Sequence, residues 1–369
     1  MTSPVPSHIL ICSLPFAPSI GGIETVSRIF AETFTKLGAR VTVVTQTEGD
    51  SVHQFEVVRC PGRAKLVELG READIILQNN ISLPTLIPLL RFRKKIVITT
   101  HTWITRMDGS IGAQDRVKLL ALRLVKNVAI SSAIAKRLPV ESKIIPNPVD
   151  VERFESFHMA HKSGDLVFMG RLVSDKGCDL LLKALASLKS KGNTPSLTII
   201  GDGPERPKLE RMTRELGIKG QVRFTGTLLE GRAEEVAKNK VLVVPSVWEE
   251  PFGLVAVEGI AAGCAVIASS KGGLPEAVGR CGLLFPNGDV ERLAACIRDL
   301  LCNQDLRSQV LAHRRSHLQT FAPKRVAGAY LDLFREMTSH KVPKDDMHQS
   351  RLVRGRTADD ADAVRSERL

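Results

Sequence analysis

The chain has 369 residues with a formal net charge of +12, and 43% of them are hydrophobic, 25% charged and 4% aromatic. The length predicts two domains, and no apolar run approaches the roughly 18–20 residues of a membrane-spanning helix. Seven cysteines, odd in number and without a close C-x-x-C pair, argue against a disulfide scaffold or a zinc site and favour a reduced, cytosolic compartment.

Positive charge is concentrated in residues 1–150, which carry 19 Lys and Arg against 12 Asp and Glu. This excess predicts an anionic partner, such as membrane lipid, nucleic acid or a phosphorylated acceptor. Nucleic acid is the weakest of these, because the chain has one Tyr and no recognised nucleic-acid motif. Residues 1–7 lack the basic and apolar stretches of a secretory signal, so we expect none.

The first half of the chain alternates between expected strands and helices. A strand at 8–13, a helix at 23–37 and a strand at 40–45 form a βαβ opening, which predicts a parallel sheet. The turn holds Gly21 and Gly22 but no G-x-G-x-x-G, which disfavours a dinucleotide-dependent oxidoreductase. Adjacent glycines let the backbone approach a diphosphate or an acceptor without a Cβ clash. Further strands are expected at 56–59, 74–77, 95–99 and 127–130.

Two features of the first half point to ligands. His101 follows the strand at 95–99, and ligands of open α/β sheets lie beyond the carboxyl ends of strands. Residues 116–126 predict a basic amphipathic helix, which together with the basic cluster at 91–95 suits an anionic bilayer surface. A packed helix with a solvated basic face is the alternative. The predicted apolar face consists of Val117, Leu120, Ala121, Leu124 and Val125.

The second half repeats the alternation. A strand from 166 ends at Gly170, and the following loop carries Arg171 and Lys176. These two cations can converge on a diphosphate, because arginine offers a bidentate fork and lysine a point charge. Strands at 197–201 and 222–225 lead to the turns that hold Gly201, Gly203 and Thr227. Helices are expected at 178–191, 205–216, 290–301, 305–320 and 321–337, and a strand at 282–285.

Residues 241–276 contain the strongest functional pattern. An apolar strand at 241–244 is followed by a loop with Glu250, and a helix from about 253 to 262 places Glu258 in its second turn. The free N–H groups and the dipole at a helix N-terminus favour an anion. Carboxylates beside such a site suit sugar hydroxyls better than the phosphate itself.

Four segments resemble the retaining glycosyltransferases of family four, which are also called glycosyl transferases group 1. The loop and helix from Glu250 to Glu258 match E-x-F-G-x-x-x-x-E, and the segment from Gly170 to Gly177 matches G-R-L-x-x-x-K-G. The turn at Gly21 resembles G-G-x-E, and residues 146–150 resemble P-N-G-V-D with Pro148 in place of the glycine.

The resemblance implies an α/β protein of the GT-B fold, in which two Rossmann-like domains face each other across a cleft. The expected boundaries are an acceptor-binding domain at 1–153, a linker at 154–165, a nucleotide-sugar-binding domain at 166–320, a helix crossing back to the first domain at 321–338 and a disordered tail at 339–369. It implies catalytic roles for His101, Arg171, Lys176 and Glu250. It also implies donor contacts for Gly21, Gly22, Gly170, Gly201, Gly203, Thr227, Phe252, Gly253, Leu254, Val255 and Glu258.

The implied activity is retaining transfer of a hexosyl or N-acetylhexosaminyl group from a UDP- or GDP-sugar to a glycan, lipid-linked or small-molecule acceptor. Such transfer would serve polysaccharide, lipopolysaccharide or glycolipid synthesis. The nucleotide-sugar is a substrate, and neither a cofactor nor a metal is expected. We expect a cytoplasmic protein with peripheral contact to the inner face of the membrane. A nucleotide-sugar epimerase and a non-catalytic sugar-nucleotide-binding paralogue are the alternatives.

Overall fold

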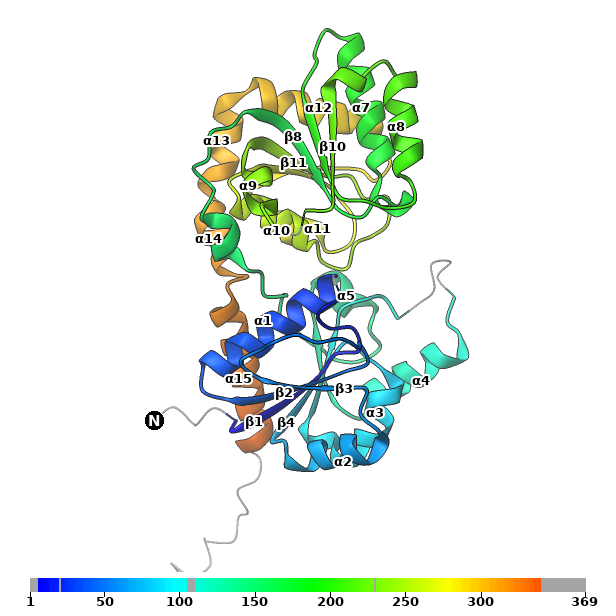
Figure 1. Ribbon diagram of the computed structural model, residues 1–369, viewed down its shortest axis with the longest axis vertical. Helices are drawn as coiled ribbons and strands as arrows, with labels where there is room; N and C mark the ends of the chain where they lie inside the picture. The colour runs from blue at the N-terminus through cyan, green and yellow to red at the C-terminus, as the bar shows by residue number, and fades with distance from the viewer. Residues whose placement is uncertain (1–5, 20, 105–109, 229, 340–369) are drawn as a thin grey trace, which may run out of the picture.

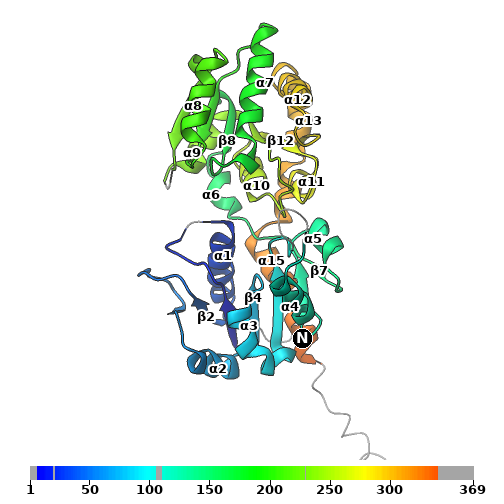
Figure 2. The ribbon, with the colours of Figure 1, turned by 90° about the vertical axis from the view of Figure 1, so that its right-hand side faces the viewer.

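The computed structural model describes residues 6–19, 21–104, 110–228 and 230–339. Of the tail expected at 339–369, only Ser339 is described, and it is the last residue of a helix. The chain forms two lobes stacked end to end, each a parallel sheet covered by helices on both faces (Figures 1 and 2). Among the described residues, no helix combines the length and apolar character needed to cross a bilayer.

The first domain contains a seven-stranded sheet in the order β3-β2-β1-β4-β5-β6-β7, with every pair parallel. Its central strands are buried along their whole length, as parallel strands covered by helices must be. The strands are β1 (His8–Cys12), β2 (Arg40–Thr45), β3 (Glu56–Arg59), β4 (Ile75–Asn79), β5 (Ile96–Thr100), β6 (Lys126–Ala129) and β7 (Lys143–Ile144).

Helices cover both faces of this sheet. They are α1 (Gly22–Lys36), α2 (Arg63–Glu72), α3 (Leu83–Leu89), the 3-10 helix Leu90–Lys95, α4 (Ala113–Leu122) and α5 (Ser132–Arg137).

The second domain begins after the short helix α6 (Val151–Glu155) and contains a six-stranded parallel sheet in the order β10-β9-β8-β11-β12-β13. The strands are β8 (Gly164–Met169), β9 (Leu197–Ile200), β10 (Val222–Gly226), β11 (Asn239–Val244), β12 (Ala265–Ser269) and β13 (Gly282–Phe285). The helices are α7 (Cys178–Ser190), α8 (Arg206–Glu215), α9 (Arg232–Ala237), α10 (Leu254–Ala261), α11 (Leu274–Val278), α12 (Val290–Cys302), α13 (Gln304–Ala312) and α14 (Arg314–Gln319).

The helix α15 (Pro323–Ser339) leaves the second domain and packs against the first (Figure 1). The ring of Tyr330 meets that of Phe30 in α1 edge to face at 4.9 Å, and its hydroxyl lies 2.8 Å from that of Thr99 in β5. Tyr330 is fully buried. The end of the chain therefore contributes to the core of the first domain.

Most expected strands lie where the periodicity placed them, and β2, β3 and β13 have the predicted bounds. Two helix predictions were wrong. The expected helix at 116–126 is α4, which ends at Leu122 because Lys126 already pairs with Val97 in the sheet. The expected helix at 305–320 is divided at His313, where the chain turns so that α14 packs on α10 and Arg314 donates to Ile260 O at 3.0 Å.

Candidate active site between the two domains

The predicted site residues lie at the carboxyl ends of strands in both sheets. His101 directly follows β5, while Gly170, Gly201 and Thr227 follow β8, β9 and β10. Glu250 lies in the loop after β11. Because parallel strands of one sheet end at the same edge, the loops with Gly170, Gly201, Thr227 and Glu250 share one edge of the second sheet, and His101 lies at the corresponding edge of the first.

Glycines bring the loops after β8 and β9 into direct backbone contact. Gly201 has φ +139°, and a Cβ placed on it would lie 1.9 Å from Gly170 O. A Cβ on Gly203 would lie 2.4 Å from Leu172 O. No other residue type fits these positions. Their closeness fixes the path of the loop that carries Arg171.

Two helix N-termini meet where the domains touch. Gly253, with φ +113°, precedes α10, whose first N–H groups at Leu254 and Val255 have no acceptor within the helix. A Cβ on Gly22 at the start of α1 would lie 3.2 Å from Leu254 Cδ1. Both helix dipoles therefore direct partial positive charge into the same region. The carboxylate of Glu24 already folds back toward Gly21 at the α1 end.

The loop before α10 is anchored by Phe252. This ring is buried and meets Phe321, just before α15, edge to face at 5.7 Å. The N-terminus of α10 is thus held by packing on the segment that leads back to the first domain.

Lys176 and Glu250 form an ion pair across the second-domain loops. Lys176 Nζ lies 2.9 Å from Glu250 Oε1, and Ser246 Oγ donates to the same oxygen at 2.5 Å. Glu250 Oε2 has no hydrogen-bond partner among the described residues, so it remains an acceptor for a hydroxyl. Arg171 is exposed, and no described residue pairs with it. The sequence did not single out Ser246, although it lies only four residues before Glu250.

Glu258 in α10, like Glu250, has one carboxylate oxygen bound to a cation. Its side chain is buried, and Arg232 of α9 donates to Oε1 at 3.0 Å. No described residue donates to Oε2. Burial raises the pKa of Glu258, although Arg232 and Arg153 oppose that shift. Arg232 was missed by the sequence analysis, because nothing in its local pattern points to a residue 26 positions away.

His101 is buried and neutral. Its Nε2 lies 2.6 Å from Asn79 Oδ1, and Asn79 Nδ2 donates to Ser27 Oγ at 2.5 Å. Ser27 donates in turn to Ile23 O at 2.8 Å, so this chain of bonds requires the proton of His101 to be on Nε2. Burial lowers the pKa of His101 to about 3. The ring therefore offers Nδ1 as a hydrogen-bond acceptor.

Thr227 is exposed at the end of β10 and has no hydrogen bond to any described residue. The loops that carry His101, Lys176, Glu250 and the two helix N-termini come together, while Arg171 and Thr227 stand unpaired at the same edge of the second sheet.

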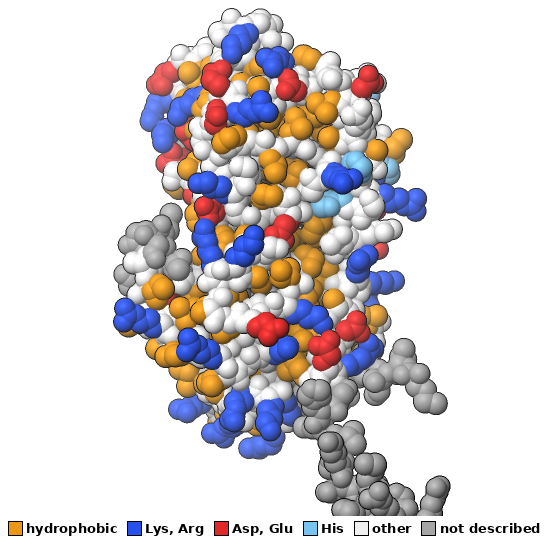
Figure 3. All heavy atoms as spheres, turned by 180° about the vertical axis from the view of Figure 1, so that it is seen from behind, with side chains coloured by type: hydrophobic (Ala, Val, Ile, Leu, Met, Phe, Trp, Pro, Cys, Tyr) orange, Lys and Arg blue, Asp and Glu red, His pale blue; other side chains and the backbone are white. Residues whose placement is uncertain are grey.

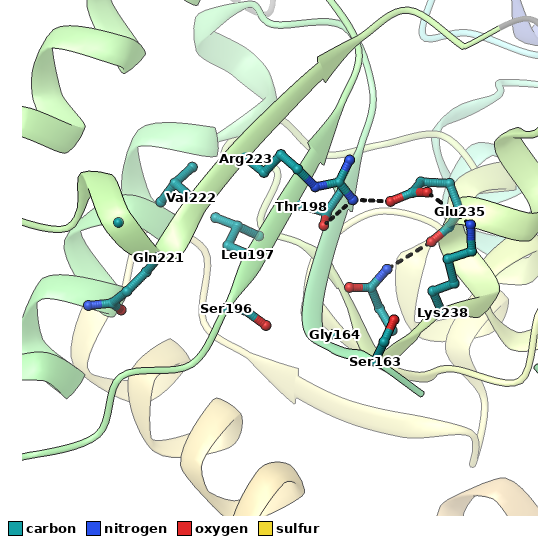
Figure 4. A pocket seen from close by; sticks show the side chains of 12 residues that line it. Ser163, Gly164, Ser196, Leu197, Thr198, Gln221, Val222, Arg223, Glu235 and Lys238 are labelled. Atoms are coloured by element: carbon teal, nitrogen blue, oxygen red, sulfur yellow. Dashed lines mark hydrogen bonds and ion pairs between the residues drawn. The ribbon is translucent and has the colours of Figure 1, made fainter. Parts of the chain in front are cut away.

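A separate hollow lies at the opposite edge of the second sheet. It encloses about 470 Å³ and is lined at the amino ends of β8, β9, β10 and β11 (Figure 4). Arg223 there pairs with Glu235 and donates to Thr198 Oγ1 at 3.2 Å, so its charge is already matched. Since ligands of such sheets lie beyond the carboxyl ends, this hollow is not the candidate active site.

Two parallel sheets of this topology, facing each other at their carboxyl ends and joined by a returning helix, define the GT-B fold. Residues 151–315 match the family model described as "Glycosyl transferases group 1". The resemblance to glycosyl transferases group 1 that the motifs predicted is therefore confirmed for the second domain.

Curated relatives carry related names. The chain is 38% identical over 172 residues to the lipopolysaccharide core biosynthesis glycosyltransferase LpsD of Rhizobium meliloti, covering 46% of this chain and 48% of that protein. It is 32% identical over 259 residues to a D-inositol 3-phosphate glycosyltransferase of Saccharomonospora viridis, covering 63% and 58%. The chain thus spans about half the length of the curated relatives it matches.

Solved structures share the fold over nearly the whole chain. The Anabaena protein Alr3699/HepE, crystallised in complex with UDP and glucose, superposes with a TM-score of 0.74 at 20% identity, covering 89% of this chain and all of that one. A glycosyltransferase from Rickettsia africae gives a TM-score of 0.76 at 18% identity, covering 90% and 98%.

Proposed function

We propose that the protein is a retaining glycosyltransferase that moves a hexosyl or N-acetylhexosaminyl group from a UDP- or GDP-sugar to a glycan or glycolipid acceptor. One observation supports this above all. Glu250 and Glu258 each have one carboxylate oxygen tied to a cation and the other without a described partner, on either side of a helix N-terminus. That arrangement suits a ligand with hydroxyls at both ends and a diphosphate between them.

The leaving diphosphate lies at the N-terminus of α10 in this proposal. Arg171 and Lys176 stabilise its charge as the bond to the sugar breaks, which is where preorganised donors lower a barrier most. Glu250 Oε2 accepts from sugar hydroxyls, and Glu258 Oε2 accepts from the ribose. His101 Nδ1 accepts a further hydroxyl of the donor sugar.

The acceptor binds on the first domain, and the leaving phosphate takes its proton on the same face of the sugar, so configuration is retained. The similarity to a lipopolysaccharide core enzyme favours a polysaccharide or lipopolysaccharide acceptor. An epimerase would need a further pair of protein carboxylates that act as acid and base on the donor sugar. A non-catalytic paralogue would bind the donor without transfer.

The experiment begins with a panel of nucleotide-sugars in a thermal-shift assay, because a ligand at 100 times its Kd stabilises by about 2.7 kcal/mol. The selected donor is then assayed for transfer in Arg171→Ala, Lys176→Ala and Glu250→Gln. Loss of one charge-stabilising donor is expected to slow transfer by roughly 10²–10³-fold. Glu250→Gln should slow transfer while leaving UDP or GDP binding nearly unchanged. Near-wild-type transfer in all three folded variants would exclude this site.

Configuration and metal dependence are tested in the same assay. NMR of the first-formed linkage should show the anomeric configuration of the donor, and turnover should survive EDTA, since Arg171, Lys176 and the helix N-terminus supply positive charge. An inverted product, or activity that EDTA abolishes and Mg²⁺ restores, would overturn these parts of the proposal.

We further propose a cytoplasmic protein that contacts anionic membrane lipid through α4. On this helix Val117 and Leu120 are 47% and 59% exposed beside the exposed Arg116. In the turn that follows the helix, Leu124 is 52% exposed beside the exposed Arg123. Figure 3 shows Lys and Arg side chains gathered at the end of the first domain away from the second, with hydrophobic groups among them. Apolar side chains flanked by cations suit an anionic bilayer surface.

A further inference from the structure

The backbone on both sides of Glu250 is bound to the first domain. Three successive carbonyl groups of this loop each accept a hydrogen bond. Glu249 O accepts from Trp103 Nε1 at 2.8 Å, and Pro251 O accepts from Ser131 Oγ at 2.7 Å. Glu250 O accepts from Gly273 N at 2.7 Å within the second domain. Two of the three donors thus come from the opposite domain.

The donor groups of the first domain are themselves fixed. Ser131 is buried and caps α5, since its Oγ accepts from Ile134 N at 3.2 Å while donating to Pro251 O. One hydroxyl therefore links a helix N-terminus to the loop.

Arg137, at the other end of α5, holds Trp103 in place. Its guanidinium lies 4.3 Å from the centre of the Trp103 ring and pairs with the carboxylate of Glu249. Glu249 and Glu250 are adjacent in the sequence but bind different domains. Glu249 pairs with Arg137 of the first domain, and Glu250 pairs with Lys176 of the second.

We propose that Trp103, Ser131 and Arg137 form an interdomain clasp that positions Glu250. The proposal rests on the proposed function, since it matters for transfer only if Glu250 contacts the donor sugar. Lys176 and Ser246 of the second domain hold the carboxylate, while the first domain holds a carbonyl on each side of Glu250, so contact between the domains sets where the backbone places that carboxylate. The second domain alone supplies Arg171, Lys176 and Glu258, so the nucleoside diphosphate binds whether or not the clasp is formed.

The central variant is Trp103→Phe, which removes the N–H donor and keeps an aromatic ring beneath Arg137. Hydrogen–deuterium exchange of the full chain reports on peptides covering 245–254. Loss of one such bond should speed exchange there about 3- to 10-fold. Transfer of the donor found in the panel should slow by about the same factor, since catalytic geometry depends on the loop. The Kd of UDP should change less than twofold.

Arg137→Ala should shift the same readouts in the same direction, and its matched control is Lys136→Ala, one residue earlier on the exposed face of α5. Ser132→Ala is the control for Ser131→Ala, which also removes the cap of α5. The double variant Arg137→Glu with Glu249→Arg reverses the two charges of the ion pair. It should recover the protection from hydrogen–deuterium exchange that either single substitution loses.

Exchange is measured without substrate, so it tests the clasp even if no donor is turned over. Unchanged exchange in 245–254 for Trp103→Phe and Arg137→Ala would overturn the proposal. Faster exchange with unchanged transfer would overturn it as well, because Glu250 would then not depend on the clasp. A wild-type chain without transfer activity would instead refute the proposed function.

Discussion

At the scale of a single residue, Glu258 has a buried carboxylate and a proposed role in binding ribose, and these two make opposite demands on its charge. Its folded-state pKa is raised, so the ionised carboxylate destabilises the folded chain at neutral pH. The free energy of unfolding therefore increases as the pH falls from the raised pKa of Glu258 in the folded chain toward its pKa in the unfolded chain. An anionic acceptor for ribose hydroxyls is lost over the same range.

We expect Glu258→Gln to separate these effects. The melting temperature at pH 7 should be unchanged or higher, because the cost of burying the charge is removed and Arg232, whose side chain is 31% exposed, can be solvated. UDP binding should weaken about 10- to 100-fold, because hydrogen bonds between the ribose and a charged carboxylate are replaced by weaker bonds to a neutral amide. Calorimetric titration and melting curves check this. A lower melting temperature with unchanged UDP affinity would show that Glu258 is purely structural.

The motif residues could be predicted because their spacing is local. Glu250, Glu258, Arg171 and Lys176 all lie within short segments where strand, loop and helix follow one another. Their partners could not be predicted in this way. Asn79 meets His101 only because β4 and β5 are neighbours in the sheet, and that adjacency is a property of the fold.

The helix α4 shows why a periodic pattern does not by itself tell which face is buried. The pattern predicted that Val117, Leu120 and Leu124 share an apolar face with Ala121 and Val125. In the fold, Ala121 and Leu122 are buried, while Val117, Leu120 and Leu124 point to solvent. The strand β6 begins four residues after the helix ends, and it fixes the rotation of α4 against the sheet.

If the exposed face of α4 and the turn after it bind membrane, replacing Leu120 and Leu124 with Ser should release the protein from anionic vesicles. Leu120 and Leu124 are 59% and 52% exposed and belong to none of the buried clusters, so the melting temperature should change little. The fraction of protein bound to anionic vesicles should fall roughly tenfold or more, because the two leucines no longer bury apolar area in the lipid. Co-sedimentation with anionic and neutral vesicles measures it. Val52→Ser is the matched control, since Val52 is fully exposed in the loop between β2 and β3. Binding of the double variant equal to wild type would contradict the proposal.

At the scale of the whole molecule, the sequence predicted two parallel-sheet domains, and the family resemblance implied the cleft and the returning helix, but the contacts that join the domains were not predicted. Repeated strand–helix alternation is enough to predict each sheet. The contacts between the domains connect residues 146 and 120 positions apart, at Trp103 with Glu249 and Ser131 with Pro251. One buried cluster includes Ile130 and Ile134 of the first domain together with Leu274 of the second. The two domain surfaces that meet here are complementary only in the folded structure, and they produce no periodic pattern in the sequence.

Because this cluster and α15 both connect the domains, we expect them to unfold together. Differential scanning calorimetry should show one transition, and UDP at 100 times its Kd should move the whole transition upward by about 3–4 °C, although the proposed contacts to UDP all come from the second domain. Arg171→Ala is the control, since an exposed residue without a described partner should leave the melting temperature unchanged and abolish most of the UDP shift. Two transitions, of which UDP moves only one, would show that the domains unfold independently and that the contacts between them are too weak to couple them.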